Sequence, residues 1–211
     1  MNADGSGLRQ VTRFDRPDVV PSWSPDGTHL VFLSIRPEGL QLYVVDRDGG
    51  EPRLLVDERF VTGPAWSPDG AWIAFRSFPS GEFRIRRVRA EGGESEPLTR
   101  GPSQGAPSWS PDGKRIFFGA GGERGPNIWA VSIEDGAERA MTDFTGRPGT
   151  LGEQGLVTDG DYLYFTWDED VGDLWVMDVV ENDSLPNGSV RGARSKRGFR
   201  ARSKTRRSAW H

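Results

Sequence analysis

The sequence predicts an all-β protein, a β-propeller of four-stranded antiparallel blades. Three observations support this class: a unit that repeats every 43 residues, apolar runs without polar alternation, and a composition rich in turn residues. The 211 residues include 28 glycines, 15 prolines and 8 tryptophans, which favours many short strands joined by tight turns over long helices. Units of about this length, buried on both faces, are what a propeller needs.

The repeat is marked by one phrase, "PSWSPDG" at 21–27, which returns as "PAWSPDG" at 64–70 and "PSWSPDG" at 107–113. A worn fourth copy follows near 156–168. Because tryptophan recurs at a single position, we expect it to pack between blades rather than to bind a ligand. The structural residues of the motif are Trp23, Pro25, Asp26, Gly27, Trp66, Pro68, Asp69, Gly70, Trp109, Pro111, Asp112, Gly113 and, in the worn copy, Asp159 and Gly160.

Each unit reads as four short strands. A brief first strand carries the tryptophan, as in 20–24, and Pro-Asp-Gly then forms a tight turn. The second strand is apolar at consecutive positions, as in 30–32, which predicts a strand covered on both faces. After a variable loop comes a third strand (42–45), and Asp-Gly-Gly leads to a weaker fourth strand ending at Val56.

The repeats place propeller sequence over residues 1–185. We predict a partial blade at 1–15 and further blades at about 19–60, 62–102, 105–145 and 152–182. Residues 1–12 match only the second half of a unit, like a lone fourth strand, and the last blade lacks one. Two explanations are open: the N-terminal strand completes the last blade in a closed four-bladed ring, or the chain is a piece of a larger propeller. We favour the piece.

The charge is divided unevenly along the chain. The overall value of −4 combines an acidic body with a tail, residues 186–211, that holds nine basic residues and no acidic one. We expect this tail to be disordered and solvated, and it is the one hint of nucleic-acid binding. Cysteine is absent, no apolar run reaches membrane-spanning length, and residues 1–20 lack a signal-peptide core. Two compartments stay open: the cytoplasm for the chain as written, and the periplasm if an N-terminal segment is missing from it.

No catalytic residue is predicted. "GPSQG" at 101–105 fits the serine-hydrolase expression, but Ser103 lies in a connection between blades with no helix after it. The histidines are His29, in a strand, and His211, in the tail, so a base for a serine nucleophile is missing. We interpret the match as chance.

No cofactor or metal is predicted either. The stretch "DEDVGD" places Asp168, Asp170 and Asp173 in one loop, where carboxylates could hold calcium, but a solvated acidic turn is favoured. Four arginines crowd the third strand of the second unit, and we expect them to pair with acidic residues of the body: Arg84, Arg86, Arg87 and Arg89.

The W-S-P-D-G phrase, the following apolar strand, the L/I-[YW]-V strand and the D-x-D-G-G turn resemble the repeats of the TolB family over residues 1 to about 180. Similar repeats form the propellers of dipeptidyl peptidase IV and prolyl oligopeptidase relatives. Propellers of the TolB type usually have six blades or more, and this chain supplies three whole ones.

The resemblance implies a non-catalytic binding or scaffold module whose channel mouth and rim loops contact a protein or peptide, as in an envelope complex of the periplasm. The alternative is the gate domain of an S9-type serine peptidase. A third, lyase-like function would need histidines along the channel, where the sequence offers His29 alone.

Overall fold

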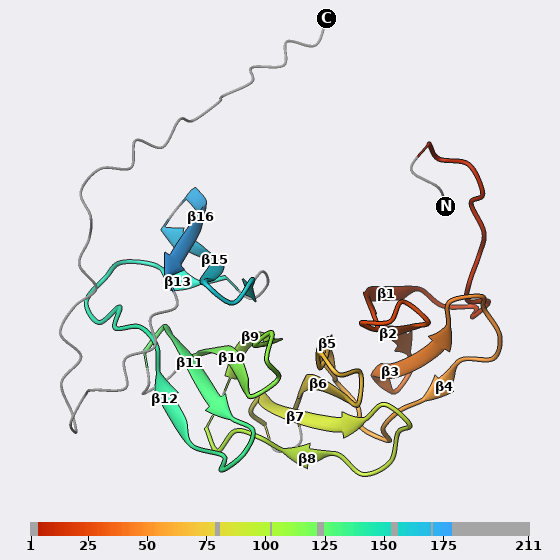
Figure 1. Cartoon of the computed structure of the whole chain (residues 1–211), viewed down its shortest axis with the longest axis horizontal. Helices are drawn as coiled ribbons and strands as arrows, with labels where there is room; N and C mark the ends of the chain where they lie inside the picture. Colours follow the sequence, from red (N-terminus) through yellow and green to blue (C-terminus); the bar gives the residue numbers. More distant parts are fainter. Residues whose placement is uncertain are drawn as a thin grey trace, which may run out of the picture. The chain divides into compact units, whose positions relative to one another are not determined.

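The computed structural model describes residues 4–78, 81–101, 103–121, 125–152, 156–169 and 171–178 (Figure 1). The chain divides into two compact units, Met1–Glu181 and Asn182–His211, and the described residues all belong to the first. They contain strands and no helix, so the prediction of an all-β fold is confirmed. The basic tail expected to be disordered lies outside the described residues.

The strands form four antiparallel sheets, which we call blades 1 to 4. Blade 1 consists of β1 (Asp18–Trp23), β2 (His29–Arg36), β3 (Gly39–Asp46) and β4 (Arg53–Leu54). Blade 2 consists of β5 (Thr62–Trp66), β6 (Trp72–Ser77), β7 (Arg84–Arg89) and β8 (Glu96–Pro97). Blade 3 consists of β9 (Ser103–Trp109), β10 (Arg115–Ala120), β11 (Asn127–Ser132) and β12 (Glu138–Ala140).

Blade 4 has a different composition. Its two short strands β13 (Thr150–Leu151) and β14 (Val157–Thr158) both pair with β15 (Tyr162–Glu169), which pairs in turn with β16 (Val171–Asp178). The first strand of the blade is therefore interrupted, and the described residues fill three strand positions. A strand following β16 would fall outside the described residues.

Successive blades contact one another through their first strands. β1 lies against β5, β5 against β9, and β9 against β14, whereas β4, β8 and β12 lie at the outer ends of their sheets (Figure 1). The first strands approach closely because glycine occupies the contact: a Cβ added at Gly63, which has φ +61°, would lie 2.7 Å from the Cβ of Ala106. Any other residue at 63 would push β5 and β9 apart.

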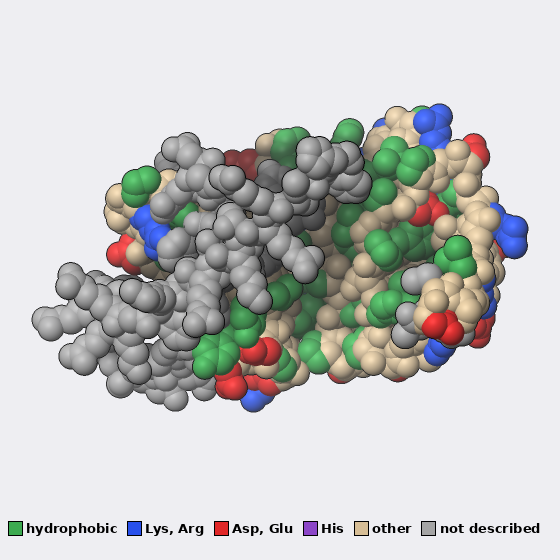
Figure 2. Space-filling model, turned by 90° about the horizontal axis from the view of Figure 1, so that it is seen from above, with side chains coloured by type: hydrophobic (Ala, Val, Ile, Leu, Met, Phe, Trp, Pro, Cys, Tyr) green, Lys and Arg blue, Asp and Glu red, His purple; other side chains and the backbone are tan. Residues whose placement is uncertain are grey.

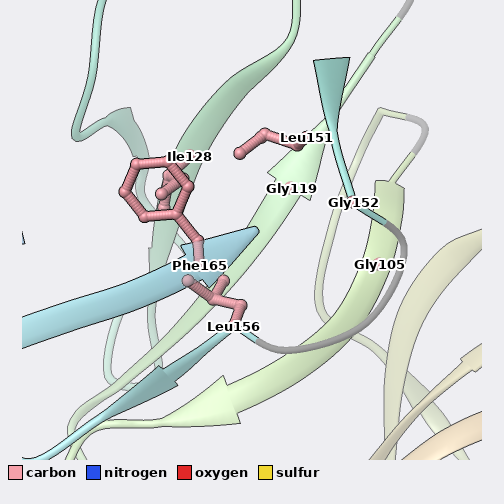
Figure 3. A pocket seen from close by; sticks show the side chains of 7 residues that line it. All are labelled: Gly105, Gly119, Ile128, Leu151, Gly152, Leu156 and Phe165. Carbon is pink, nitrogen blue, oxygen red and sulfur yellow. The ribbon is translucent and has the colours of Figure 1, made fainter. Parts of the chain in front are cut away.

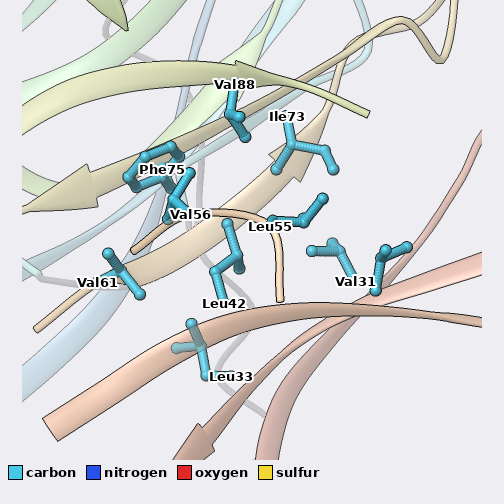
Figure 4. Close-up of a cluster of buried hydrophobic side chains, with 10 residues drawn as sticks. Val31, Leu33, Leu42, Leu55, Val56, Val61, Ile73, Phe75 and Val88 are labelled. Carbon is cyan, nitrogen blue, oxygen red and sulfur yellow. The ribbon is translucent and has the colours of Figure 1, made fainter. Parts of the chain in front are cut away.

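The core is divided into clusters between blades rather than gathered at one centre. The cluster between blades 1 and 2 takes side chains from both sheets and is drawn in Figure 4. The second strands explain this arrangement, since Ile73 and Ala74 are both fully buried and point to opposite faces. Ile73 packs toward blade 1 and Ala74 toward blade 3, as the lack of polar alternation predicts.

The motif tryptophans link neighbouring blades through hydrogen bonds. Trp66 donates its indole N–H to the carbonyl of Ser22 in blade 1 at 3.2 Å, and Trp109 donates to the carbonyl of Ala65 in blade 2 at 3.1 Å. Trp109 is 8% exposed, but Trp23 is 55% exposed. The same sequence motif is therefore buried or open depending on whether a blade precedes it.

The Ser-Pro-Asp-Gly turn is built by its aspartate. The carboxylate of Asp26 accepts hydrogen bonds from the Ser24 hydroxyl at 2.6 Å and the Thr28 amide at 3.0 Å. The Ser24 bond contributes most, and together with the Thr28 bonds it lowers the pKa of Asp26 from 3.8 to about 2. Asp69 and Asp112 accept the same bonds in their blades, and their pKa values are also lowered.

The proline of each turn contacts the next blade. A Cβ added at Gly70 would lie 3.8 Å from Pro25, one at Gly113 would lie 3.8 Å from Pro68, and one at Gly160 would lie 3.3 Å from Pro111. The turn thus forms part of the joint between blades as well as a hairpin. In blade 4 the turn lacks the Ser-Pro pair, and the carboxylate of Asp159 accepts from the Tyr162 amide at 2.8 Å instead.

The first prediction contrasts two tryptophans of identical motif. We expect Trp109→Ala to lower the free energy of unfolding by about 3–5 kcal/mol, because a buried indole and its hydrogen bond are lost. Trp23→Ala should cost under about 1 kcal/mol, since its ring is half-exposed. Urea denaturation in dilute solution measures both, and equal losses for the two variants would contradict the assigned burial.

The second prediction concerns acid stability. The pKa of Asp26 is lowered on folding, so its carboxylate stabilises the fold above about pH 4, and this contribution is lost as the pH falls through about 2. Ser24→Ala removes the strongest hydrogen bond and should raise the pKa of Asp26 toward 3.8. Titration of the carboxyl carbon by NMR checks this, and an unchanged pKa in the variant would refute the assigned cause.

Candidate functional site

An open groove of about 430 Å³ lies where the connection between blades 1 and 2 meets blade 2. Glu58, Arg59 and Phe60 come from the β4–β5 connection, Phe78 follows β6, and Arg86 lies on β7. We call these five residues the rim groove. Figure 2 shows the molecule from above Figure 1, with hydrophobic side chains on the described surface and charged ones toward its edge.

Glu58 and Arg86 form the fixed end of the rim groove. The Arg86 Nε lies 3.2 Å from the Glu58 carboxylate, and the two side chains are 21% and 24% exposed. Ser95 completes the contact, because its hydroxyl donates to Glu58 and accepts from Arg86 Nε at 2.7 Å. This pair joins the connection to β7, so it holds the groove in shape and is not free for a ligand.

Phe60 is presented to solvent by an unusual backbone. Its φ is +57°, a left-handed conformation that a bulky residue rarely adopts. The next residue, Val61, is fully buried and donates its amide to the Leu40 carbonyl at 3.2 Å. Burial of Val61 directs Phe60 outward, where it is 54% exposed with its ring beside Gly39. Such strain is concentrated at functional sites.

Phe78 is the second exposed ring of the groove and is supported from below. It is 40% exposed and packs on Phe83 with ring centroids 4.9 Å apart. The buried guanidinium of Arg76 lies 4.2 Å from the Phe83 ring centroid, a cation–π contact that fixes this ring. Phe78 therefore presents an apolar face on a rigid base.

Arg59 provides the charge of the groove. It is exposed, and no described residue forms an ion pair or hydrogen bond with its guanidinium. An exposed cation beside two phenyl rings suits a ligand that combines an apolar group with a carboxylate, because the guanidinium binds carboxylates in a bidentate manner.

A second hollow lies between blades 3 and 4 (Figure 3). Ile128, Leu151, Leu156 and Phe165 point toward one another there, beside three glycines. Its volume of about 10 Å³ holds one water molecule at most. We interpret it as an imperfection of packing between blades and not as a ligand site.

The residues with possible chemistry are not brought together. Ser103 is 4% exposed, and its hydroxyl donates to the Phe83 carbonyl at 3.2 Å. The Nε2 of His29 lies 3.0 Å from Asp46 at the surface of blade 1. Within the described ranges, no group of three His, Cys, Asp or Glu residues could hold a metal. Asp168 is exposed, and the Asp170 and Asp173 side chains lie outside the described residues.

The arginines of β7 lie in ion pairs or against an indole. Arg84 pairs with Glu82 at 3.5 Å, Arg86 with Glu58 as described, and Arg87 with Glu96 at 2.8 Å. Arg87 and Arg89 also lie 4.1 and 4.0 Å from the ring centroid of Trp72. These contacts account for the basic strand without a ligand.

Four antiparallel sheets that contact one another through their first strands define the class, a β-propeller array with a groove on its rim. The family model of the TolB beta propeller domain matches residues 1–150. The chain belongs to the TolB β-propeller family, and the resemblance read from the repeat motif is confirmed. Among the described residues, no helix is long and apolar enough to cross a membrane.

Relatives and solved structures agree with this family. A Tol-Pal system protein TolB from Thioalkalivibrio sulfidiphilus is 38% identical over 50 residues, which are 24% of this chain and 12% of that protein. A TolB-type structure from Agrobacterium tumefaciens is 28% identical with a TM-score of 0.65, over 81% of this chain and 61% of that one. A puromycin-hydrolyzing peptidase from Mycobacterium tuberculosis, 18% identical over 83% of this chain and 29% of its own, has a TM-score of 0.66 and shows the fold alone. The chain spans less than two thirds of each.

The rim groove was not predicted from the sequence. Phe60 and Phe78 lie in the variable connections, outside the repeated phrase. The sequence signal for such a site was an aromatic residue within a polar loop. The pairing of Glu58 with Arg86 joins residues 28 positions apart and follows from the arrangement of the blades.

The third prediction tests the fixed end of the groove. Glu58→Gln should lower the free energy of unfolding by about 1 kcal/mol, because a partly buried ion pair with a shared serine is broken. The control is Glu82→Gln, whose carboxylate is 53% exposed and pairs with Arg84 at 3.5 Å, and it should change stability by about zero. Similar losses in both variants would show that Glu58 is no better positioned than a surface charge.

Proposed function

We propose that this chain is a non-catalytic binding module of the TolB propeller type, and that the rim groove binds a peptide segment of a protein partner. One observation carries the proposal: two exposed phenyl rings, Phe60 and Phe78, line the same groove as Arg59, whose guanidinium has no partner among the described residues. The segment that fits is extended and carries an apolar side chain next to an acidic one. Binding sites of this kind commonly lie on loops held by a rigid scaffold.

The family supports a protein partner over a small substrate. Relatives bear the name of the Tol-Pal system, and we infer on the resemblance that this chain acts with other proteins in the cell envelope. The peptidase-gate alternative has only fold likeness behind it, at 18% identity. In addition, buried Ser103 donates its hydroxyl to a backbone carbonyl, which is not the arrangement of a nucleophile.

The fourth prediction tests the groove with a random peptide library displayed on phage. We expect the enriched peptides to combine aromatic or aliphatic residues with Asp or Glu. Phe60→Ser and Arg59→Glu should each weaken binding of a selected peptide at least about tenfold, a loss of about 1.4 kcal/mol. Fluorescence polarisation with the labelled peptide measures Kd.

The matched control is Leu54→Ser, which removes an apolar side chain of similar exposure (38%) on β4, away from the groove. Its Kd should equal that of the unchanged protein. Selected peptides that bind all three variants with one Kd would exclude the rim groove, and failure to enrich any peptide would count against peptide binding altogether.

A further inference from the structure

The joints between blades 1 and 2 and between blades 2 and 3 share one indole hydrogen bond, and blade 1 presents the donor of such a bond at its edge without an acceptor among the described residues. Trp66 and Trp109 each donate the indole N–H to a carbonyl in the blade before. Trp23 occupies the same position in blade 1, but it is 55% exposed and no described residue accepts from its indole. Val20 beside it is 43% exposed. This edge of blade 1 has the chemistry of a joint between blades.

The N-terminal segment already occupies part of the place of a preceding blade. Residues 4–12, expected to form a lone fourth strand, form no strand, yet Arg9 donates to the carbonyls of Arg47 and Asp48. Arg53 on β4 makes the same two bonds to carbonyls of blade 2, 43 residues further along. Residues 9–12 therefore lie on blade 1 as the outer strand of a preceding blade would.

The segment is anchored there and does not merely rest on the surface. The carbonyl of Val11 would lie 3.2 Å from a Cβ at Gly49, just as the Leu55 carbonyl would lie 3.1 Å from one at Gly92. Phe14 packs edge-on against Tyr43 with centroids 5.2 Å apart. Residues 9–12 thus hold the position of an outer strand relative to blade 1. The described residues contain no inner strands of a preceding blade beside this segment.

Blade 4 offers the complementary surface. Val157 pairs with Tyr164 in blade 4 at the same register position at which Ser22 pairs in blade 1 and Ala65 pairs in blade 2. The Val157 carbonyl therefore stands where the acceptors of the indole bonds stand. Val157 is 56% exposed, and the neighbouring Tyr162 is 41% exposed. Moreover, β16 pairs with β15 and with no other strand of the described part of the chain.

We propose that two copies of this chain associate head to tail, with blade 4 of one copy packed on the edge of blade 1 of the other. Trp23 donates its indole N–H to the Val157 carbonyl of the second copy, and residues 9–12 lie beside β16 of that copy as its outer strand. The second copy is the occupant that fits, because the described residues of its last blade fill three strand positions and present an exposed acceptor. The proposal concerns the blade edges and does not depend on the rim groove.

Paired variants test this arrangement, because the interface uses two different surfaces. Size-exclusion chromatography with light scattering should give the 211-residue chain a concentration-dependent mass of at least twice the 23.3 kDa monomer. Trp23→Arg and Val157→Arg should each reduce the mass to that of one chain. A 1:1 mixture of the two variants should restore a dimer and nothing larger, since one intact interface remains.

Controls separate a local effect from unfolding. Leu54→Arg places the same charge on the exposed outer strand and should leave the assembly unchanged, while circular dichroism checks that each variant is folded. If an arginine variant does not fold, Trp23→Phe keeps the ring and removes the indole donor, and it should weaken association several-fold.

Three results would overturn the proposal. A folded chain that remains a monomer at every concentration would show that blade 1 and blade 4 do not join two copies. Assembly that survives Trp23→Arg would place the interface elsewhere. A mixture of the two arginine variants that stays monomeric would exclude the head-to-tail pairing of blade 1 with blade 4.

Discussion

The indole hydrogen bond from one blade to the carbonyl of the blade before is the interaction on which the structure depends. A four-stranded sheet with apolar side chains on both faces cannot bury them alone, so each blade needs two neighbours. The bonds of Trp66 and Trp109 fix the position of each inner strand along its neighbour in the next blade. Gly63 permits the close approach of the strands that these bonds require. Together they set the register between sheets that share no strand pairing.

The motif phrase has two structural functions, which explains why its residues recur as a group. Asp26 closes the hairpin by accepting from the hydroxyl and amide on either side of it, and Pro25 contacts Gly70 of the following blade. In blade 4 these functions separate. Gly160 still meets Pro111, which belongs to blade 3, but the local turn is rebuilt on Asp159 and Tyr162. Blade 4 therefore keeps the glycine that lies next to the preceding blade, whereas the tryptophan, serine and proline of the motif are absent from it.

Much of the fold could be predicted because it depends on local pattern and period. The consecutive apolar residues of the second strands predicted burial on both faces, and Ile73 and Ala74 are fully buried on opposite sides. The exposure of Trp23 could not be predicted, because its sequence surroundings equal those of Trp109 and only the neighbouring blade differs. The exposure of Phe60 could not be predicted either, because it results from the burial of Val61, which contacts residues distant in the sequence.

The connection that precedes the first strand of a blade contacts the third strand at the same position in blades 1 and 2, but with different chemistry. This difference distinguishes the part of the surface that is free to vary from the part that is constrained. In blade 1, Phe14 meets Tyr43 as an aromatic pair, whereas in blade 2, at the matching positions, Glu58 meets Arg86 as an ion pair. The blade edges cannot vary in this way, because each must fit a neighbour of fixed shape. Ligand specificity is therefore expected on the rim, where Phe60 lies, and assembly on the edges, where the repeat is exact in spacing.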